Sequence, residues 1–516
     1  MLQSDQVFAF RASKVDYIAV VVMAVLSVVF FLITNAPVIS GDQLTITAIH
    51  QYLNQAPFLA SDPIYGKKDL YLQINLGVII FPFLQWLGGT VELGIHYFVA
   101  MLHFLQLGVA YPVFTSLTKS RRYGLALSLL STIPVHAPGA TFWGVALNGT
   151  LYARAIYLPF ATLLIYSFIC RTFSSEPKGL RGTFILLGLT AWIHPISAAY
   201  LFLIFLLSLI CFRATVKQLF ICASYFLVGA AYFIIPFLLH RPPTRPMEMV
   251  LHNQEYQLLL ERAYPWAFSF QTILTEAAMM ICSPAGVILV LCYLAYRQGF
   301  PLKRIMAMVI CTSVAASLPY VFQRLLYIGF ETPFFFIEVW RGFRFIPPLA
   351  YFGLALILGQ HSMRSRSSQS QPWFFLLLIC LCWLLSFGIS TTPHKKTTCD
   401  HGIFRAAQML PETAVVVSDL QELRYCSEKA LFSSRQDFGM AYYHSRAAFK
   451  DLFDRLDAQE HFARAPAQDS LAELASLGAT HIILSRHAPP TLPLREVEVA
   501  GNYRLYAIEL PSGRVK

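Results

Sequence analysis

The sequence predicts a polytopic α-helical membrane protein with about eleven spans, followed by a small extracytoplasmic α/β domain. Three observations lead to this fold class. Of the 516 residues, 56% are hydrophobic and only 13% are charged, a balance typical of polytopic membrane proteins. The apolar residues gather in long runs separated by short basic loops. After Thr392 the pattern changes to short strand-like runs between polar turns.

The first apolar run, residues 17–35, follows Arg11 and Lys14, as the apolar region of a signal peptide would. The run is long, however, and no small-x-small cleavage site precedes Asp42. We therefore expect an uncleaved membrane anchor.

Basic loops decide which apolar runs cross the membrane. The apolar runs lie near residues 17–35, 71–89, 93–117, 123–140, 151–170, 182–195, 197–212, 218–239, 271–296, 305–325, 344–361 and 373–392. If all of them crossed, the basic loop Lys119–Arg122 would lie opposite the N-terminus. If 71–89 instead lies in the membrane interface, the basic loops all fall on the cytoplasmic side, as the positive-inside rule requires. The prediction is eleven spans, with the N-terminus inside and the C-terminus outside.

The runs 182–195 and 197–212 are short for full spans, and His194-Pro195 breaks the helix between them. They could form a bent hairpin or one long kinked helix. The positions of the basic loops favour the hairpin.

Residues 1–392 therefore form a transmembrane module, with a first outer loop at 36–92, and residues 393–516 a separate outer domain. Strands are expected at 414–418, 430–433 and 481–485, with helices at 440–456 and 470–477. A final hairpin, 494–499 and 503–510, turns at Gly501-Asn502. This alternation predicts a small α/β fold with a largely parallel sheet and a structural or acceptor-recognition role.

Eight of the ten cysteines lie in apolar runs, where a thiol is a small buried hydrophobe. Only Cys399 and Cys426 lie in the polar tail. If the tail is outside the cytoplasm, a disulfide between them is compatible with the compartment but is not determined by the sequence. The net charge of +11 comes from basic loops between spans, so it does not call for nucleic acid.

Candidate site residues gather at the outer ends of the predicted spans. Asp42 and Asp62 lie in the first outer loop, and His50 lies two helical turns after Asp42. A carboxylate at the mouth of a span is costly and usually marks function, although Asp62, before Pro63, also suits a turn.

Three arginines do not belong to the predicted cytoplasmic loops. Arg341 and Arg344 are three residues apart at the start of a late span, and Arg154 lies at the start of another span. Their planar donors match the oxygens of a phosphate. Snorkelling to headgroups, or pairing with Glu331 or Glu338, is the structural alternative for Arg341 and Arg344. His194 is either a substrate ligand or the cap of the break at Pro195.

An acid in the first outer loop, an interfacial helix after it, about eleven spans and a soluble outer C-terminal domain together resemble GT-C glycosyltransferases, in a poorly characterised bacterial branch. The segments Gln51–Pro63, Leu186–Pro195 and Trp340–Phe345 agree with this resemblance. The resemblance is architectural over nearly the whole chain. It implies an integral membrane enzyme that uses a polyprenyl-phosphate-linked sugar. Many members carry two adjacent acids in the first loop, whereas here Gln43 follows Asp42. No cofactor is assigned, and the use of a divalent cation stays open.

Transfer from a lipid phosphate needs a base for the acceptor proton and cations for the leaving phosphate. Asp42 is the best candidate for this base, and a turn or helix-terminus carboxylate is its structural alternative. The expected substrate-binding residues are Arg341, Arg344, Arg154, His50, Asp62 and His194. We expect Arg341 and Arg344 to line the cavity that contains Asp42.

Three functions compete. The first is a glycosyltransferase of the bacterial inner membrane that moves a sugar onto a lipid, glycan or protein on the outer side. The second is a catalytically silent scaffold of a membrane complex, which the single acid at 42–43 favours. The third is a transporter or flippase. Transporters usually show paired halves and charges in the middle of the membrane, whereas the polar residues here lie at the outer ends.

Overall fold

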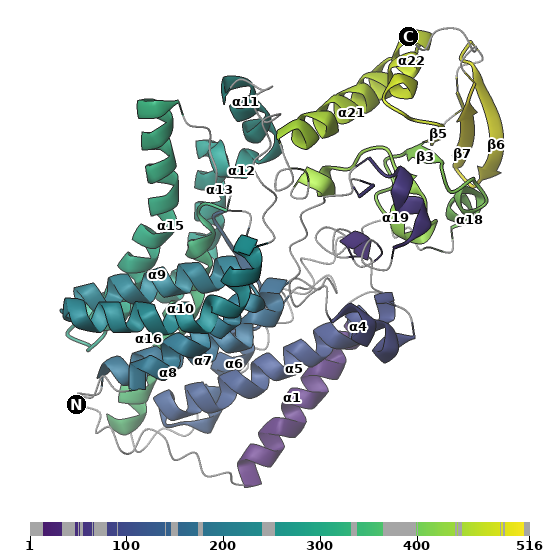
Figure 1. The fold of residues 1–516 in the computed structure, drawn as a ribbon. Helices are drawn as coiled ribbons and strands as arrows, with labels where there is room; N and C mark the ends of the chain where they lie inside the picture. The colour runs from purple at the N-terminus through teal and green to yellow at the C-terminus, as the bar shows by residue number, and fades with distance from the viewer. Residues whose placement is uncertain are drawn as a thin grey trace. The chain divides into compact units, whose positions relative to one another are not determined.

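The computed structural model describes most of the chain (Figure 1). The described residues are 14–33, 47–49, 51, 55–63, 65–66, 80–89, 91–139, 141–145, 153–173, 179–239, 253–331, 338–364, 399, 401–438, 441, 446–485, 487–488 and 491–509. They belong to two compact units. The helical unit comprises Met1–Pro37, Pro82–Leu239 and Tyr264–Thr392, and the sheet unit comprises Val38–Phe81, His240–Ala263 and Pro393–Lys516.

The helical unit consists of apolar helices and one short hairpin. Its α-helices are α1 (Lys14–Ile33), α4 (Phe81–Gly88), α5 (Val91–Thr118), α6 (Arg121–Leu130), α7 (Ala153–Phe173), α8 (Leu180–Leu189), α9 (Pro195–Cys211), α10 (Val216–Leu239), α12 (Pro265–Phe268), α13 (Phe270–Cys282), α14 (Pro284–Arg297), α15 (Lys303–Phe330) and α16 (Ile346–Arg364). The 3₁₀ turns η4 (Thr190–Trp192) and η6 (Arg341–Phe345) precede α9 and α16, and the hairpin pairs β1 (Val135–Ala137) with β2 (Thr141–Trp143).

Five of the described helices are long and apolar enough to cross a membrane, or six if the bent pair α13–α14 counts as one span. The protein is therefore a helical, membrane-embedded protein. The expected run 373–392 lies outside the described residues. So does most of 71–89, of which α4 occupies the end.

Side-chain contacts give the relative directions of α1, α5 and α7. α1 and α5 are antiparallel, because Asp16 accepts a hydrogen bond from Tyr111 at 2.8 Å while Ser27 lies 2.9 Å from His103. α5 and α7 are parallel, because Gln106 donates to Thr162 at 3.3 Å and the Ser116 and Tyr166 hydroxyls lie 2.8 Å apart.

α8 and α9 form the predicted hairpin. α8 runs antiparallel to α7, since Thr183 bonds Ser167 and Gly179 lies against Arg171. α9 runs parallel to α7, as the ring contacts Tyr157–His194 and Phe168–Phe205 require. The two short helices are therefore antiparallel, and the alternative of one long kinked helix is wrong.

Basic residues collect at one end of the helical unit. There, Arg121 pairs with Asp16 at 2.9 Å, and Arg304 donates to the Thr172 carbonyl and lies over the Phe212 ring. The other basic residues at this end are Lys119, Arg122, Arg171, Arg181, Arg213, Lys217, Arg297 and Lys303. The opposite end of the unit holds Tyr157, His194 and the segment before α16.

The sheet unit contains a five-stranded sheet in the order β4-β3-β5-β7-β6. The strands are β3 (Val415–Val417), β4 (Ala430–Leu431), β5 (His481–Leu484), β6 (Leu494–Ala500) and β7 (Tyr503–Ile508). The helices and turns of the unit whose bounds the structure describes are α11 (Asn253–Ala263), α18 (Gly402–Gln408), α19 (Leu423–Cys426), α21 (Arg446–Arg464), α22 (Gln468–Ser476), η2 (Pro57–Ser61) and η7 (Arg435–Asp437).

The expected strands are present, but the sheet is mixed. β3 pairs in parallel with β4 and β5, whereas β7 pairs antiparallel with β5 and β6. β6 and β7 form the final hairpin, whose tight turn makes these two strands antiparallel to each other, and β7 adds antiparallel to the β5 edge.

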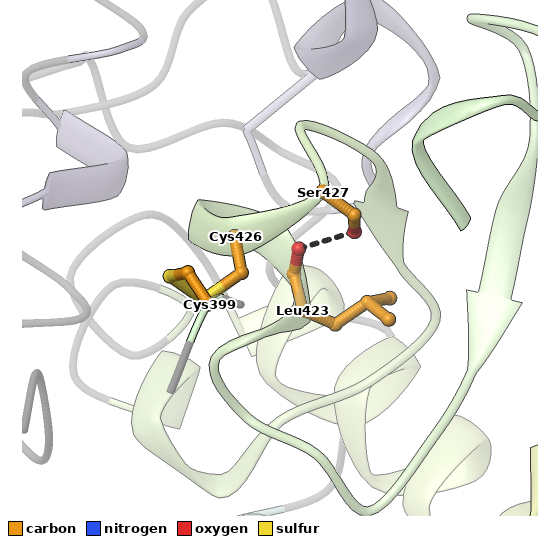
Figure 2. Close-up of a disulfide and its surroundings, with 4 residues drawn as sticks. All are labelled: Cys399, Leu423, Cys426 and Ser427. Carbon is orange, nitrogen blue, oxygen red and sulfur yellow. Dashed lines mark hydrogen bonds between the residues drawn. A yellow bond between two sulfur atoms is a disulfide. The ribbon is translucent and has the colours of Figure 1, made fainter. Parts of the chain in front are cut away.

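Two apolar cores lie in this unit. One contains Phe462 of α21 and Leu471 of α22, and the other contains Phe404 of α18 and Leu423 of α19. Cys399 and Cys426 form a disulfide (Figure 2).

Candidate functional site

The segment from Glu338 to Phe345 is the centre of the candidate site in the helical unit. It enters η6 through Trp340, which has a left-handed backbone with φ of 66°. Three contacts hold Trp340: its backbone N–H donates to the Ala316 carbonyl, its indole N–H donates to the Ala267 carbonyl, and its ring lies 4.7 Å from the Tyr320 ring. The segment is thus fixed between α12 and α15.

The two predicted arginines have different environments. Arg341 is ion-paired with Glu338, as the structural alternative proposed. Arg344 is only 2% exposed and lies close enough to the Tyr157 and Tyr200 hydroxyls to interact with them electrostatically. Residues three apart eclipse one another along a 3₁₀ helix, so both arginines leave the same side of η6.

Tyr200 of α9 closes one side of this segment. Its hydroxyl donates to the Glu338 carbonyl at 2.8 Å. A methyl group at Gly342 would come within 2.8 Å of the Tyr200 ring and 3.0 Å of Ala316. Gly342 therefore lets the arginine segment lie directly on α9 and α15.

Glu276 of α13 supports the other side and was not predicted from the sequence. Its Oε2 accepts a hydrogen bond from the Gly139 N–H at 2.8 Å. Gly139 has φ of +91°, and a Cβ there would lie 2.9 Å from the Val339 carbonyl and 3.0 Å from the Arg341 nitrogen. The signal in the sequence is a carboxylate inside the apolar run 271–296, which is costly in a membrane.

His194 caps α9. Its Nδ1 accepts from the Ser197 N–H at 3.0 Å and lies 2.7 Å from the Ser197 hydroxyl. The capping alternative for His194 is therefore confirmed, and its ring lies 6.3 Å from Tyr157, near the arginine segment. A role in substrate binding stays a prediction.

The other predicted residues are only partly described. Asp42 and His50 lie outside the described residues. Arg154 is in the first turn of α7, but its side chain is outside the described part of the structure. The shared cavity of Asp42, Arg341 and Arg344 stays a prediction.

Asp62 belongs to the sheet unit and forms a buried ion pair. Its Oδ2 accepts from Arg424 Nε at 2.9 Å, and its Oδ1 accepts from the Tyr65 N–H at 3.0 Å. Asp437 binds the other side of the Arg424 guanidinium at 2.9 and 3.0 Å. Asp62 is 3% exposed, so its carboxylate has a structural task in addition to the turn that the sequence suggested.

The electrostatics of this cluster follow from burial. Burial alone would lower the pKa of Arg424, but the carboxylates of Asp437 and Asp62 outweigh it and raise that pKa above its ordinary value. Burial, followed by the nearby Asp437 charge, raises the pKa of Tyr65 well above its ordinary value. Arg424 therefore stays charged and Tyr65 neutral at any physiological pH.

Within the described part of the chain, no three His, Cys, Asp or Glu side chains lie close enough together to hold a metal ion. No protein-family model matches the chain, and no curated protein matches it.

Proposed function

We propose that the protein is a membrane glycosyltransferase that moves a sugar from a polyprenyl-phosphate carrier to an acceptor on the outer side of the bacterial inner membrane. The observation that carries the proposal is the buried Arg344, which shares η6 with Arg341 and lies within electrostatic range of Tyr157 and Tyr200, at the end of the bundle opposite the basic loops. Arginine donors suit a phosphate that has left its sugar.

The distribution of charge supports the orientation. The basic end of the helical unit faces the cytoplasm in this proposal, as the positive-inside rule requires. Arg344 then lies at the outer end of its helix, where a lipid phosphate is accessible. The disulfide of the sheet unit suits an oxidising compartment outside the cytoplasm.

Contacts within the sheet unit support the same orientation. Asp62 binds Arg424, and Arg262 of α11 binds Asp457 of α21. In the proposed topology Asp62, α11 and the C-terminal domain therefore lie on one side of the membrane. In this proposal all six apolar runs between 71–89 and residue 253 cross the membrane, and 71–89 lies in the interface.

In this proposal Asp42 takes the proton from the acceptor hydroxyl, and Arg344 and Arg341 stabilise the leaving phosphate. Glu276 and Tyr200 hold the arginine segment through Gly139 and Glu338. Lipid-linked sugars are the donor class, and a lipid, glycan or protein is the acceptor.

The test replaces Asp42 by Asn, which keeps the shape of the side chain and removes the base. We expect turnover to fall by about 100-fold or more, with protein abundance and donor binding near those of the wild type. Asp469→Asn, on the exposed start of α22, is the control and should transfer sugar normally. The glycan profile of the producing cell and transfer by the purified protein are the readouts.

A scaffold function is the second candidate. It is favoured by the structural use of Asp62, the described acid of the first outer loop, in an ion pair with Arg424. A scaffold predicts that deletion of the gene alters the glycan profile while Asp42→Asn leaves it unchanged. That result would refute the catalytic role of Asp42.

A further inference from the structure

Asp62 joins the first outer loop to an edge of the sheet. Its Oδ2 accepts from the backbone N–H of Leu431 at 3.3 Å as well as from Arg424. Leu431 lies in β4, which is an edge strand. Edge strands carry backbone groups that no neighbouring strand satisfies. Here a side chain 369 residues away in the sequence satisfies one of them.

The junction consists of three charged side chains that are almost completely buried and pair with one another. Arg424 bridges Asp62 and Asp437, and the three side chains are 7%, 0% and 1% exposed. The Arg424 guanidinium also lies 4.8 Å from the centre of the Tyr65 ring. The Asp62 and Asp437 carboxylates both accept hydrogen bonds from the Arg424 guanidinium. Because this group is planar and its donors have fixed directions, it sets the positions of both carboxylates.

The helix that carries Arg424 is itself held in place. α19 has four residues. Its last residue, Cys426, is bonded to Cys399, and the following Ser427 hydroxyl donates to the Leu423 carbonyl at 2.6 Å (Figure 2). The Arg424 side chain therefore projects from a fixed turn of the backbone.

We propose that Arg424 is a positioning residue for the first outer loop. It holds the turn Pro57–Gly66 against β4 and so restricts the chain that carries Asp42. Thr47, Ala48 and Ile49 of this loop are buried. Asp42 lies five residues before Thr47, a stretch that spans at most about 18 Å. The hold on the loop does not depend on the proposed function. The effect of the loop position on catalysis by Asp42 rests on the proposed function.

Limited proteolysis tests the hold on the loop. Lys67 and Lys68 follow the turn directly in the sequence and are trypsin sites. In the full-length protein in membranes, Arg424→Met should speed cleavage at these lysines by about tenfold or more, because it leaves two buried carboxylates unpaired. Arg435→Met is the matched control. It breaks an ion pair with Glu460 in which the arginine is 69% exposed, and it should leave the cleavage rate unchanged.

A triple variant without the three buried charges distinguishes two effects of Arg424: holding the loop in place, and neutralising the buried carboxylates. Asp62→Asn, Arg424→Met and Asp437→Asn together remove all three buried charges at similar volume, a replacement that proteins often tolerate. We expect residues 401–509 to stay protease-resistant with the disulfide formed. The lysines should still be cut about tenfold faster than in the wild type, and transfer should fall with donor binding retained.

Wild-type cleavage of the loop in either variant would overturn the proposal. Faster cleavage with wild-type transfer would overturn the link from Arg424 to catalysis. Faster cleavage in a protein whose wild type transfers no sugar would support the hold on the loop and refute the proposed glycosyltransferase activity.

Discussion

At the scale of single residues, His481 makes the sheet pH-dependent. It lies in β5 with its ring 2.9 Å from the Thr480 hydroxyl, and burial, followed by the Arg495 charge, lowers its pKa from 6.5. The unfolded chain therefore binds the proton more tightly. The neutral His481 ring therefore contributes to the free energy of unfolding above about pH 6.5, and this contribution is lost as the pH falls below that value. Hydrogen exchange of the β5 amides, corrected for intrinsic rates, should be faster at pH 5 than at pH 7, and His481→Gln should reduce this difference. Equal pH dependence in both proteins would contradict this assignment.

At the scale of helices, α8 and α10 meet through two glycines. A Cβ at Gly188 would collide with the Phe226 carbonyl, and one at Gly229 would collide with the Ile185 carbonyl. Small residues allow such close helix contacts in membranes. Gly188→Leu should lower the stability of the folded protein by about 2 kcal/mol or more, measured as the loss of monodisperse protein on heating in detergent. Gly182→Leu on the same helix is the control, because its Cβ would meet nothing within 4 Å. Equal losses for the two variants would show that the contact is unimportant.

At the scale of the whole molecule, the orientation predicts which positions reagents can reach. Single cysteines at Glu255 and Asp469, both exposed in the sheet unit, should react with a membrane-impermeant maleimide in intact cells. A cysteine at Lys119, at the basic end of the helical unit, should react only after the membrane is opened. Labelling of Lys119 and Asp469 from the same side would contradict the orientation and the interfacial placement of 71–89.

The sequence predicted the features that depend on local pattern. Apolar periodicity located the strands, and the break at His194-Pro195 with the basic loops on either side indicated the hairpin of α8 and α9. The expected parallel sheet was only half right. β3 pairs in parallel with β4 and β5, but β7 pairs antiparallel with β5, and the order of strands and helices along the chain does not specify that pairing.

Contacts between distant segments could not be predicted. Asp62 and Arg424 are 362 residues apart, and no local signal pairs one carboxylate of a loop with one arginine of a later helix. The same holds for Glu276 and Gly139, which are 137 residues apart. Of these four residues only Asp62 was singled out from the sequence, because an acid near a membrane span is costly.

The central claim is that Arg344 binds the phosphate of a lipid carrier. The direct measurement is the affinity of the detergent-solubilised protein for a short-chain polyprenyl monophosphate, by calorimetry, in the wild type and in Arg344→Gln. The control is Arg121→Gln, which removes an ion pair with Asp16 at the basic end. Since a charged hydrogen bond to phosphate contributes about 1.5–3 kcal/mol, we predict that Arg344→Gln binds at least about tenfold more weakly than the wild type and the control. Equal affinity of all three proteins, with Arg344→Gln still folded, would contradict the proposed phosphate site.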